Sequence, residues 1–234
     1  MPKRQVCAWM ALLAAGGAAQ TAGEPVWKDK LIAEWTAGEA RQVLTDSPWA
    51  KPVTPSASGA AAGGQQRVGM GAGGVGIGGM GMGRHGGRGR GSIGAAGADA
   101  GPMPALTLRW ASAMPTIAAE LIAREVNAPS VDESQYAIAV YGLPGRMIHG
   151  DPNKMGGELK KHAAIKREGK KDMKPSSVEV LMHDEGPVIL YLFPRSNEIT
   201  REDQQLDFDA EIGGLKLAQS FIPGEMVYQG KLEL

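Results

Sequence analysis

The chain has 234 residues, of which 34 are glycine and only 5% are aromatic. Its 25 basic and 25 acidic side chains balance, which argues against a protein that binds polyanions over its whole surface. A single cysteine excludes a disulfide scaffold and a cysteine-cluster metal site. No apolar run reaches the roughly 18 residues that a membrane-spanning helix needs.

The N-terminus has the pattern of an export signal. A basic start is followed by an apolar run (AWMALLAA, residues 8–15) and by small residues before a cleavage point after Ala19. We therefore predict a signal peptide over 1–19 and a secreted or periplasmic mature protein. Cys7 lies inside this signal, so the mature chain has no thiol, which suits an oxidising compartment.

A short helical segment rich in tryptophan follows at residues 20–54. Thr36 and Glu39 form the sequence pattern of a capping box, which predicts a helix over residues 37–45. Pro48 ends that pattern because it lacks an N–H donor and disfavours helix in the residue before it.

The apolar residues of this segment need a surface to cover them, because a nine-residue helix is marginal alone in water. We therefore treat them as a docking segment, which binds either to the C-terminal domain of this chain or to another protein of the cell envelope. Its residues are Trp27, Trp35, Val43, Leu44 and Trp49.

Residues 55–102 have the composition of a disordered linker. More than a third of them are glycine, and no periodic apolar face is present. Several G-x-G-x-x-G matches lie in this range, as glycine density alone produces, but none follows a predicted strand or opens a helix, so no dinucleotide cofactor is predicted.

The linker also contains a short arginine–glycine tract with Arg84, Arg88 and Arg90. The simplest interpretation is that these arginines keep the linker soluble. The alternative is that they bind an anionic polymer of the envelope. No nucleic-acid partner is expected, because no aromatic side chain is interleaved with the arginines.

Residues 103–234 are predicted to form an α+β, mainly β domain of about 130 residues, which is enough to bury a core. Residues 106–111 alternate as in a strand, and one clear helix follows from Pro115 to about Glu125. Further strands make an antiparallel sheet of at least five strands. They are expected at residues 136–141, 178–182, 188–193, 206–212, 215–221 and 226–234.

Two pairs of adjacent glycines indicate different local structures, one a hairpin loop and the other the end of a helix. Gly213 and Gly214 form a two-residue hairpin loop between alternating strands, because both positions need a positive φ. Residues 151–160 are ambiguous: Asp151-Pro152 starts a helix well, but Gly156 and Gly157 should stop it within about a turn.

No complete catalytic motif is present. The candidates for a metal-dependent or hydrolytic enzyme are His149, Asp151 and His183, although their spacing does not show that they converge. His183 also begins a run of polar residues that is typical of a hairpin tip. We predict no cofactor.

Four stretches carry a resemblance to other sequences. They are W-T-x-x-E-A-x-x-V-L-x-D-S-P-W-A-K (Trp35 to Lys51), KPSSVEVL (174–181), YLFPRSNEIT (191–200) and MVYQGKLEL (226–234). Together they resemble an uncharacterised family of secreted proteins from soil bacteria of the acidobacterial type. The resemblance supports the three-part architecture and implies no activity.

The leading functional hypothesis is a non-catalytic extracytoplasmic interaction or scaffold protein. The sequence has clear strand patterns but no complete set of catalytic residues. The tryptophan-rich helix is expected to be tethered to the domain by a flexible linker. Such a tether sets a local concentration that lets the helix exchange between its own domain and a partner.

Overall fold

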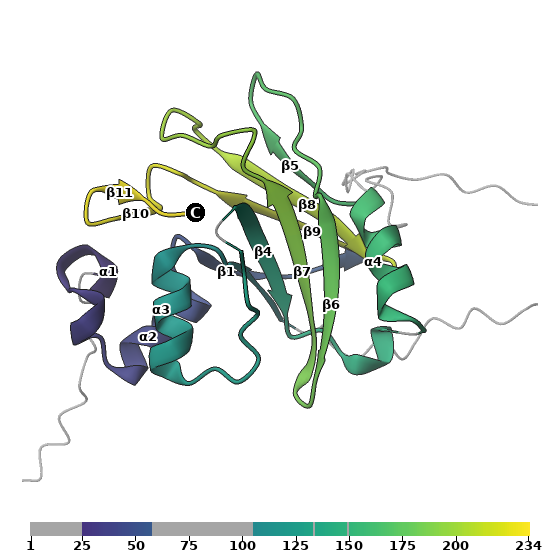
Figure 1. Cartoon of the computed structure of the whole chain (residues 1–234), viewed down its shortest axis with the longest axis horizontal. Coiled ribbons are helices and arrows are strands. Elements are labelled where there is room, and N and C mark those ends of the chain that lie inside the picture. Colours follow the sequence, from purple (N-terminus) through teal and green to yellow (C-terminus); the bar gives the residue numbers. More distant parts are fainter. Residues whose placement is uncertain (1–24, 58–104, 133, 149) are drawn as a thin grey trace, which may run out of the picture.

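The computed structural model describes residues 25–57, 105–132, 134–148 and 150–234 (Figure 1). These residues form the predicted α+β, mainly β fold, built from two antiparallel sheets, a small hairpin and four α-helices. The helices are α1 (Val26–Asp29), α2 (Ala37–Thr45), α3 (Met114–Ala123) and α4 (Pro152–Lys161), with 3-10 turns η1 (Ile32–Glu34) and η2 (Gly145–Met147). The strands are β1 (Ala50–Val53), β2 (Ser56–Ala57), β3 (Leu106–Trp110), β4 (Gln135–Tyr141), β5 (Ala164–Arg167), β6 (Ser177–His183), β7 (Gly186–Pro194), β8 (Leu206–Ile212), β9 (Leu215–Phe221), β10 (Val227–Tyr228) and β11 (Lys231–Leu232).

The N-terminal segment contributes an edge strand to each of the two sheets. The five-stranded sheet has the order β1-β3-β4-β7-β6, and the four-stranded sheet has the order β2-β9-β8-β5. Only Thr54 and Pro55 separate β1 from β2. Helices α1, α2 and α3 gather at one end of the molecule beside the β10–β11 hairpin, whereas α4 lies at the opposite end against β6 (Figure 1).

The larger of two hydrophobic clusters in the described residues joins the two sheets and the N-terminal segment, residues 25–57. Trp110 of β3 packs edge-to-face on Phe221 of β9, with 5.5 Å between ring centroids, and Tyr191 of β7 packs in the same way on Phe208 of β8 at 5.3 Å. Trp49 belongs to the same buried cluster. Residues 25–57 and the sheets therefore share one core.

Several local predictions are confirmed. Helix α2 begins and ends where predicted, and both hydrogen bonds of the capping box between Thr36 and Glu39 are present. Gly213 and Gly214 have φ values of 55° and 84° and connect β8 to β9, whose residues pair in antiparallel register.

The helix start predicted at Asp151-Pro152 is confirmed, but the stop expected at Gly156 and Gly157 is wrong, since α4 continues through both to Lys161. The domain therefore has two helices in its described part, where one was expected. A Cβ atom at Gly156 would lie 2.3 Å from the carbonyl oxygen of Val178. Close packing of α4 on β6 therefore requires glycine at this position, and that packing outweighs the low helix propensity of glycine.

The prediction of one continuous strand over residues 226–234 is also wrong. This stretch is a small hairpin, because Gln229 and Gly230 have φ values of 47° and 77° and turn the chain between β10 and β11. A further difference lies at the boundary of the predicted linker: Ser56 and Ala57 form β2, which pairs with β9.

Candidate functional site

The predicted docking segment lies mostly inside this protein's own fold. Trp35, Val43, Leu44 and Trp49 are buried in the main hydrophobic cluster, and only Trp27 is half-buried. Trp27 is the only tryptophan of the described residues that reaches the surface to this extent. The side chain of Trp27 is therefore the part of this segment that remains available to a ligand.

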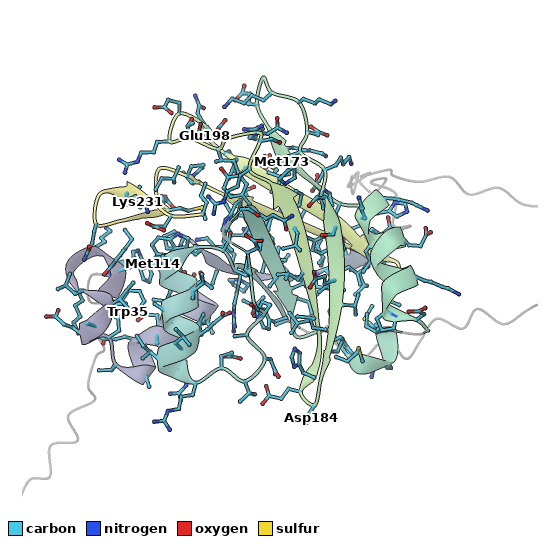
Figure 2. All side chains as sticks on the ribbon, in the orientation of Figure 1. Trp35, Met114, Met173, Asp184, Glu198 and Lys231 are labelled. Carbon is cyan, nitrogen blue, oxygen red and sulfur yellow. The ribbon has the colours of Figure 1, made fainter. Side chains whose placement is uncertain are left out.

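Two hydrogen bonds join the N-terminal segment to the C-terminal end of the chain. The indole N–H of Trp49 donates to the carbonyl oxygen of Glu233 at 2.8 Å, in a buried position. The backbone N–H of Ile32 donates to the hydroxyl oxygen of Tyr228, also at 2.8 Å. These contacts place α1, α2 and the β10–β11 hairpin around one surface region, seen near Trp35 and Lys231 in Figure 2.

A cleft of about 640 Å³ lies in this region, between α1, the C-terminal end of α2, the start of β1 and the chain before β10. Trp27 forms part of its wall, and its ring meets Trp49 edge-to-face, with centroids 6.2 Å apart and an interplanar angle of 82°. Its volume falls within the range of about 300–1,000 Å³ that is typical of ligand sites. The lining residues are Pro25, Trp27, Lys28, Gln42, Asp46, Ser47, Pro48, Lys51, Gly224, Glu225 and Val227.

The long polar side chains of this cleft have no partners within the described part of the chain. Those of Lys28, Gln42, Asp46, Lys51 and Glu225 make no hydrogen bond or ion pair with another described residue. They supply two positive charges, two negative charges and one neutral amide. The cleft therefore combines an aromatic surface with unused donors and acceptors, which is the composition of a binding site.

A second candidate is a buried polar cluster on the outer face of the five-stranded sheet. The guanidinium of Arg109 lies 4.0 Å from the ring centroid of Tyr141, and its Nη1 atom is 3.6 Å from Glu120 Oε1 and 3.9 Å from Glu125 Oε2. The hydroxyl of Tyr141 donates to Glu120 at 3.1 Å. Glu120 also lines a cleft of about 410 Å³ between α3 and the chain that follows it.

Burial raises the pKa of Glu120 to about 7, although the nearby Arg109 guanidinium favours its ionised form. A shifted carboxyl group in a cavity is one mark of a functional site, but structural ion pairs shift pKa values as well. Here Arg109 also donates through Nε to the carbonyl oxygen of Leu44, which closes the C-terminal end of α2. The cluster therefore joins α2, α3, β3 and β4, and we assign it a structural role.

Sequence reasoning did not find either feature. Arg109 lies between Leu108 and Trp110 in an apolar strand, and this isolated charge was the available signal for a buried ion pair. The cleft as a whole had no such signal, although Trp27 was among the predicted docking residues, because its lining comes from three separate stretches of the chain.

The structure describes two of the three residues of the enzyme hypothesis, Asp151 and His183. His149 lies outside the described residues. Asp151 is exposed just before α4, and His183 is half-buried at the end of β6, at the hairpin tip that was predicted. No group of three or more His, Cys, Asp or Glu side chains within the described residues is arranged to hold a metal ion. The hypothesis therefore stays a prediction.

Arg84, Arg88 and Arg90 also lie outside the described residues, so the anionic-polymer hypothesis stays a prediction. Within the described ranges, no helix is long and apolar enough to cross a membrane.

Comparisons with protein-family models, curated proteins and solved structures found no match to this chain. The resemblance to secreted proteins of soil bacteria therefore stays a prediction.

Proposed function

We propose that this chain is a non-catalytic extracytoplasmic binding protein whose ligand occupies the cleft beside Trp27. One observation carries the proposal: a half-buried indole shares a cleft of about 640 Å³ with polar side chains that have no partner in the described structure. The predicted signal peptide supports an extracytoplasmic location, and it lies outside the described residues.

The chemistry of the cleft favours binding over catalysis. Ser47 has the only hydroxyl group among its lining residues, and that hydroxyl donates to the carbonyl oxygen of Val43 at 2.7 Å. It also accepts from the backbone N–H groups of Trp49 and Ala50. Because this oxygen is already committed to the turn after α2, it is a poor nucleophile, and the lining contains no histidine to activate it.

The test is recovery of a ligand by the protein itself. The chain from Gln20 onward is immobilised, exposed to a cell-envelope extract and washed, and the retained compounds are identified by mass spectrometry. Wild-type protein should retain a compound that is eluted chemically unchanged. Trp27→Ala and Gln42→Ala should lose it, whereas Gln204→Ala should keep it, because Gln204 is an exposed glutamine lining a different cleft.

Two results would overturn the proposal. Conversion of the compound into a product would indicate an enzyme. Equal retention by all variants, or by none, would show that this cleft is not the ligand site. Export is tested separately by sequencing the N-terminus of the protein recovered outside the cytoplasm, which should begin at Gln20.

A further inference from the structure

The residues of the cleft beside Trp27 indicate the chemical class of its ligand. This inference rests on the proposed function. The indole is held in place, since its ring packs edge-to-face on the buried Trp49. Pro25 and Pro48 add two further rigid apolar contacts at the same cleft. A half-buried aromatic ring in the wall of a cleft suits a ligand with a flat apolar face and a polar rim.

The polar side chains require a ligand that both donates and accepts hydrogen bonds. Asp46 and Glu225 only accept when ionised, Lys28 and Lys51 only donate, and the amide of Gln42 does both. A hydroxyl group is a donor and an acceptor at once, so a ligand with many hydroxyl groups can pair with every one of these side chains.

The charge of the cleft favours a neutral ligand. Its two lysines and two carboxylates cancel, and four of its five long polar side chains are exposed, with Lys51 half-buried. Ion pairs to exposed groups contribute little and are screened by salt. A strongly charged polymer would therefore gain little here from either sign of charge.

The backbone beside the cleft does not favour an extended peptide. Strand β1 is an edge strand, but Pro52 within it has no N–H to donate. The N–H and the carbonyl of Ala50 are both bonded to Ser47. A peptide strand added at this edge would lack the regular ladder of main-chain hydrogen bonds on which such binding depends.

We infer that the ligand of this cleft is a neutral oligosaccharide, whose sugar ring packs on the indole of Trp27 while its hydroxyl groups bond to Gln42, Asp46 and Glu225. The C–H face of a pyranose ring supplies the flat apolar surface, and its equatorial hydroxyl groups supply the polar rim.

The experiment is a direct titration with pure sugars. The chain from Gln20 onward is titrated with neutral oligosaccharides of glucose, mannose, xylose and N-acetylglucosamine, and binding is followed by calorimetry and tryptophan fluorescence. One of these sugars should bind saturably, with an affinity that hardly changes with salt. Trp27→Ala should weaken that binding about tenfold or more, and Trp27→Phe should restore much of it.

Matched variants test the polar contacts. Asp46→Asn should weaken binding several-fold, whereas Asp184→Asn should not, because Asp184 lies at the tip of the β6–β7 hairpin, outside this cleft (Figure 2). Each variant is first shown to unfold cooperatively at the wild-type urea concentration, so that lost binding is not lost folding.

The remaining outcomes separate this inference from the proposed function. Sugar binding that survives Trp27→Ala would place the sugar site elsewhere and overturn the inference. If no neutral sugar binds but amino acids or peptides bind in a Trp27-dependent manner, the sugar assignment is wrong and the binding function stands. If neither class binds and the envelope extract also yields no ligand, both proposals fail.

Discussion

The indole N–H of Trp49 bonds to the backbone carbonyl of Glu233, so a residue near the start of the described chain is joined to its last but one. Both residues are buried, and the ring of Trp49 also packs edge-to-face on that of Trp27. Removal of residues 25–57 would therefore expose part of the core.

We predict that Trp49→Phe lowers the free energy of unfolding by about 2 kcal/mol, because it leaves a small cavity and an unpaired buried carbonyl. Urea unfolding measures the loss. The matched variant is Trp27→Phe, which changes a half-buried ring whose indole N–H makes no hydrogen bond within the described residues, and it should cost less than about 0.5 kcal/mol. Equal losses in the two variants would contradict the role assigned to Trp49.

Gly156 and Gly157 offer a test on neighbouring residues of one helix. A Cβ atom at Gly156 would strike the carbonyl of Val178 at 2.3 Å, whereas one at Gly157 would meet no atom within 4 Å. Gly156→Ala should therefore destabilise the protein by about 1–3 kcal/mol through overpacking of α4 on β6.

Gly157→Ala should stabilise it by about 0.5–1 kcal/mol through helix propensity. Thermal and urea unfolding of both variants give the comparison. A Gly156→Ala protein as stable as wild type would show that α4 does not pack on β6 as described.

Tyr191 and Tyr136 form a second matched pair. The hydroxyl of Tyr191 is buried without a hydrogen-bond partner, whereas that of Tyr136 accepts from the backbone N–H of Ile199 at 3.1 Å. Tyr191→Phe should raise stability by up to about 1 kcal/mol, because it removes an unpaired buried polar group.

Tyr136→Phe should lower stability by about 1–2 kcal/mol, because it leaves the Ile199 N–H unpaired. Urea midpoints of the two single variants test the pair. Destabilisation by both would indicate that Tyr191 has a partner, such as a buried water molecule.

Glu120 predicts a pH dependence of stability. Its pKa in the folded protein is about 7 against an ordinary 4.5, because burial disfavours the charged form. The unfolded chain therefore releases this proton at lower pH than the folded protein does. The contribution of the protonated Glu120 carboxyl group to the free energy of unfolding is fully present below pH 4.5. It is lost as the pH rises toward 7, and the loss amounts to about 3 kcal/mol in all.

The variant Glu120→Gln stays neutral at every pH, so its stability should change less over this range than that of wild type. Glu168→Gln serves as the control at an exposed site and should follow the wild-type curve. Unfolding free energies measured in urea between pH 4.5 and 7.5 decide the matter. Parallel curves for wild type and Glu120→Gln would show that this carboxyl group does not carry the effect.

Local patterns were sufficient to predict much of the fold. The alternation of β8 and β9 and the turn at Gly213-Gly214 follow from side chains within a few residues of one another. The fold class follows from the number of such strands. The errors arose where distant contacts decide. From the sequence alone, Gly156 is expected to end a helix. In the folded chain, it allows α4 to pack closely against the carbonyl of Val178.

The candidate site was predictable only in part. Trp27 was singled out as a docking residue, but Trp35, Val43, Leu44 and Trp49 were singled out with it, and these four are buried in the core. No periodicity distinguishes a tryptophan that fills a core from one that lines a cleft. The distinction depends on what the rest of the chain places on each ring.

Elements with local causes could be read from neighbouring residues: the capping box of α2, the glycine hairpin and the alternating strands. Three features depend on the folded chain: the tryptophan segment shares a core with the sheets, Arg109 pairs with Glu120, and Gln42 and Glu225 line one cleft. Hydrogen bonds within a turn act between neighbours in sequence, whereas burial and ion pairing act between neighbours in space.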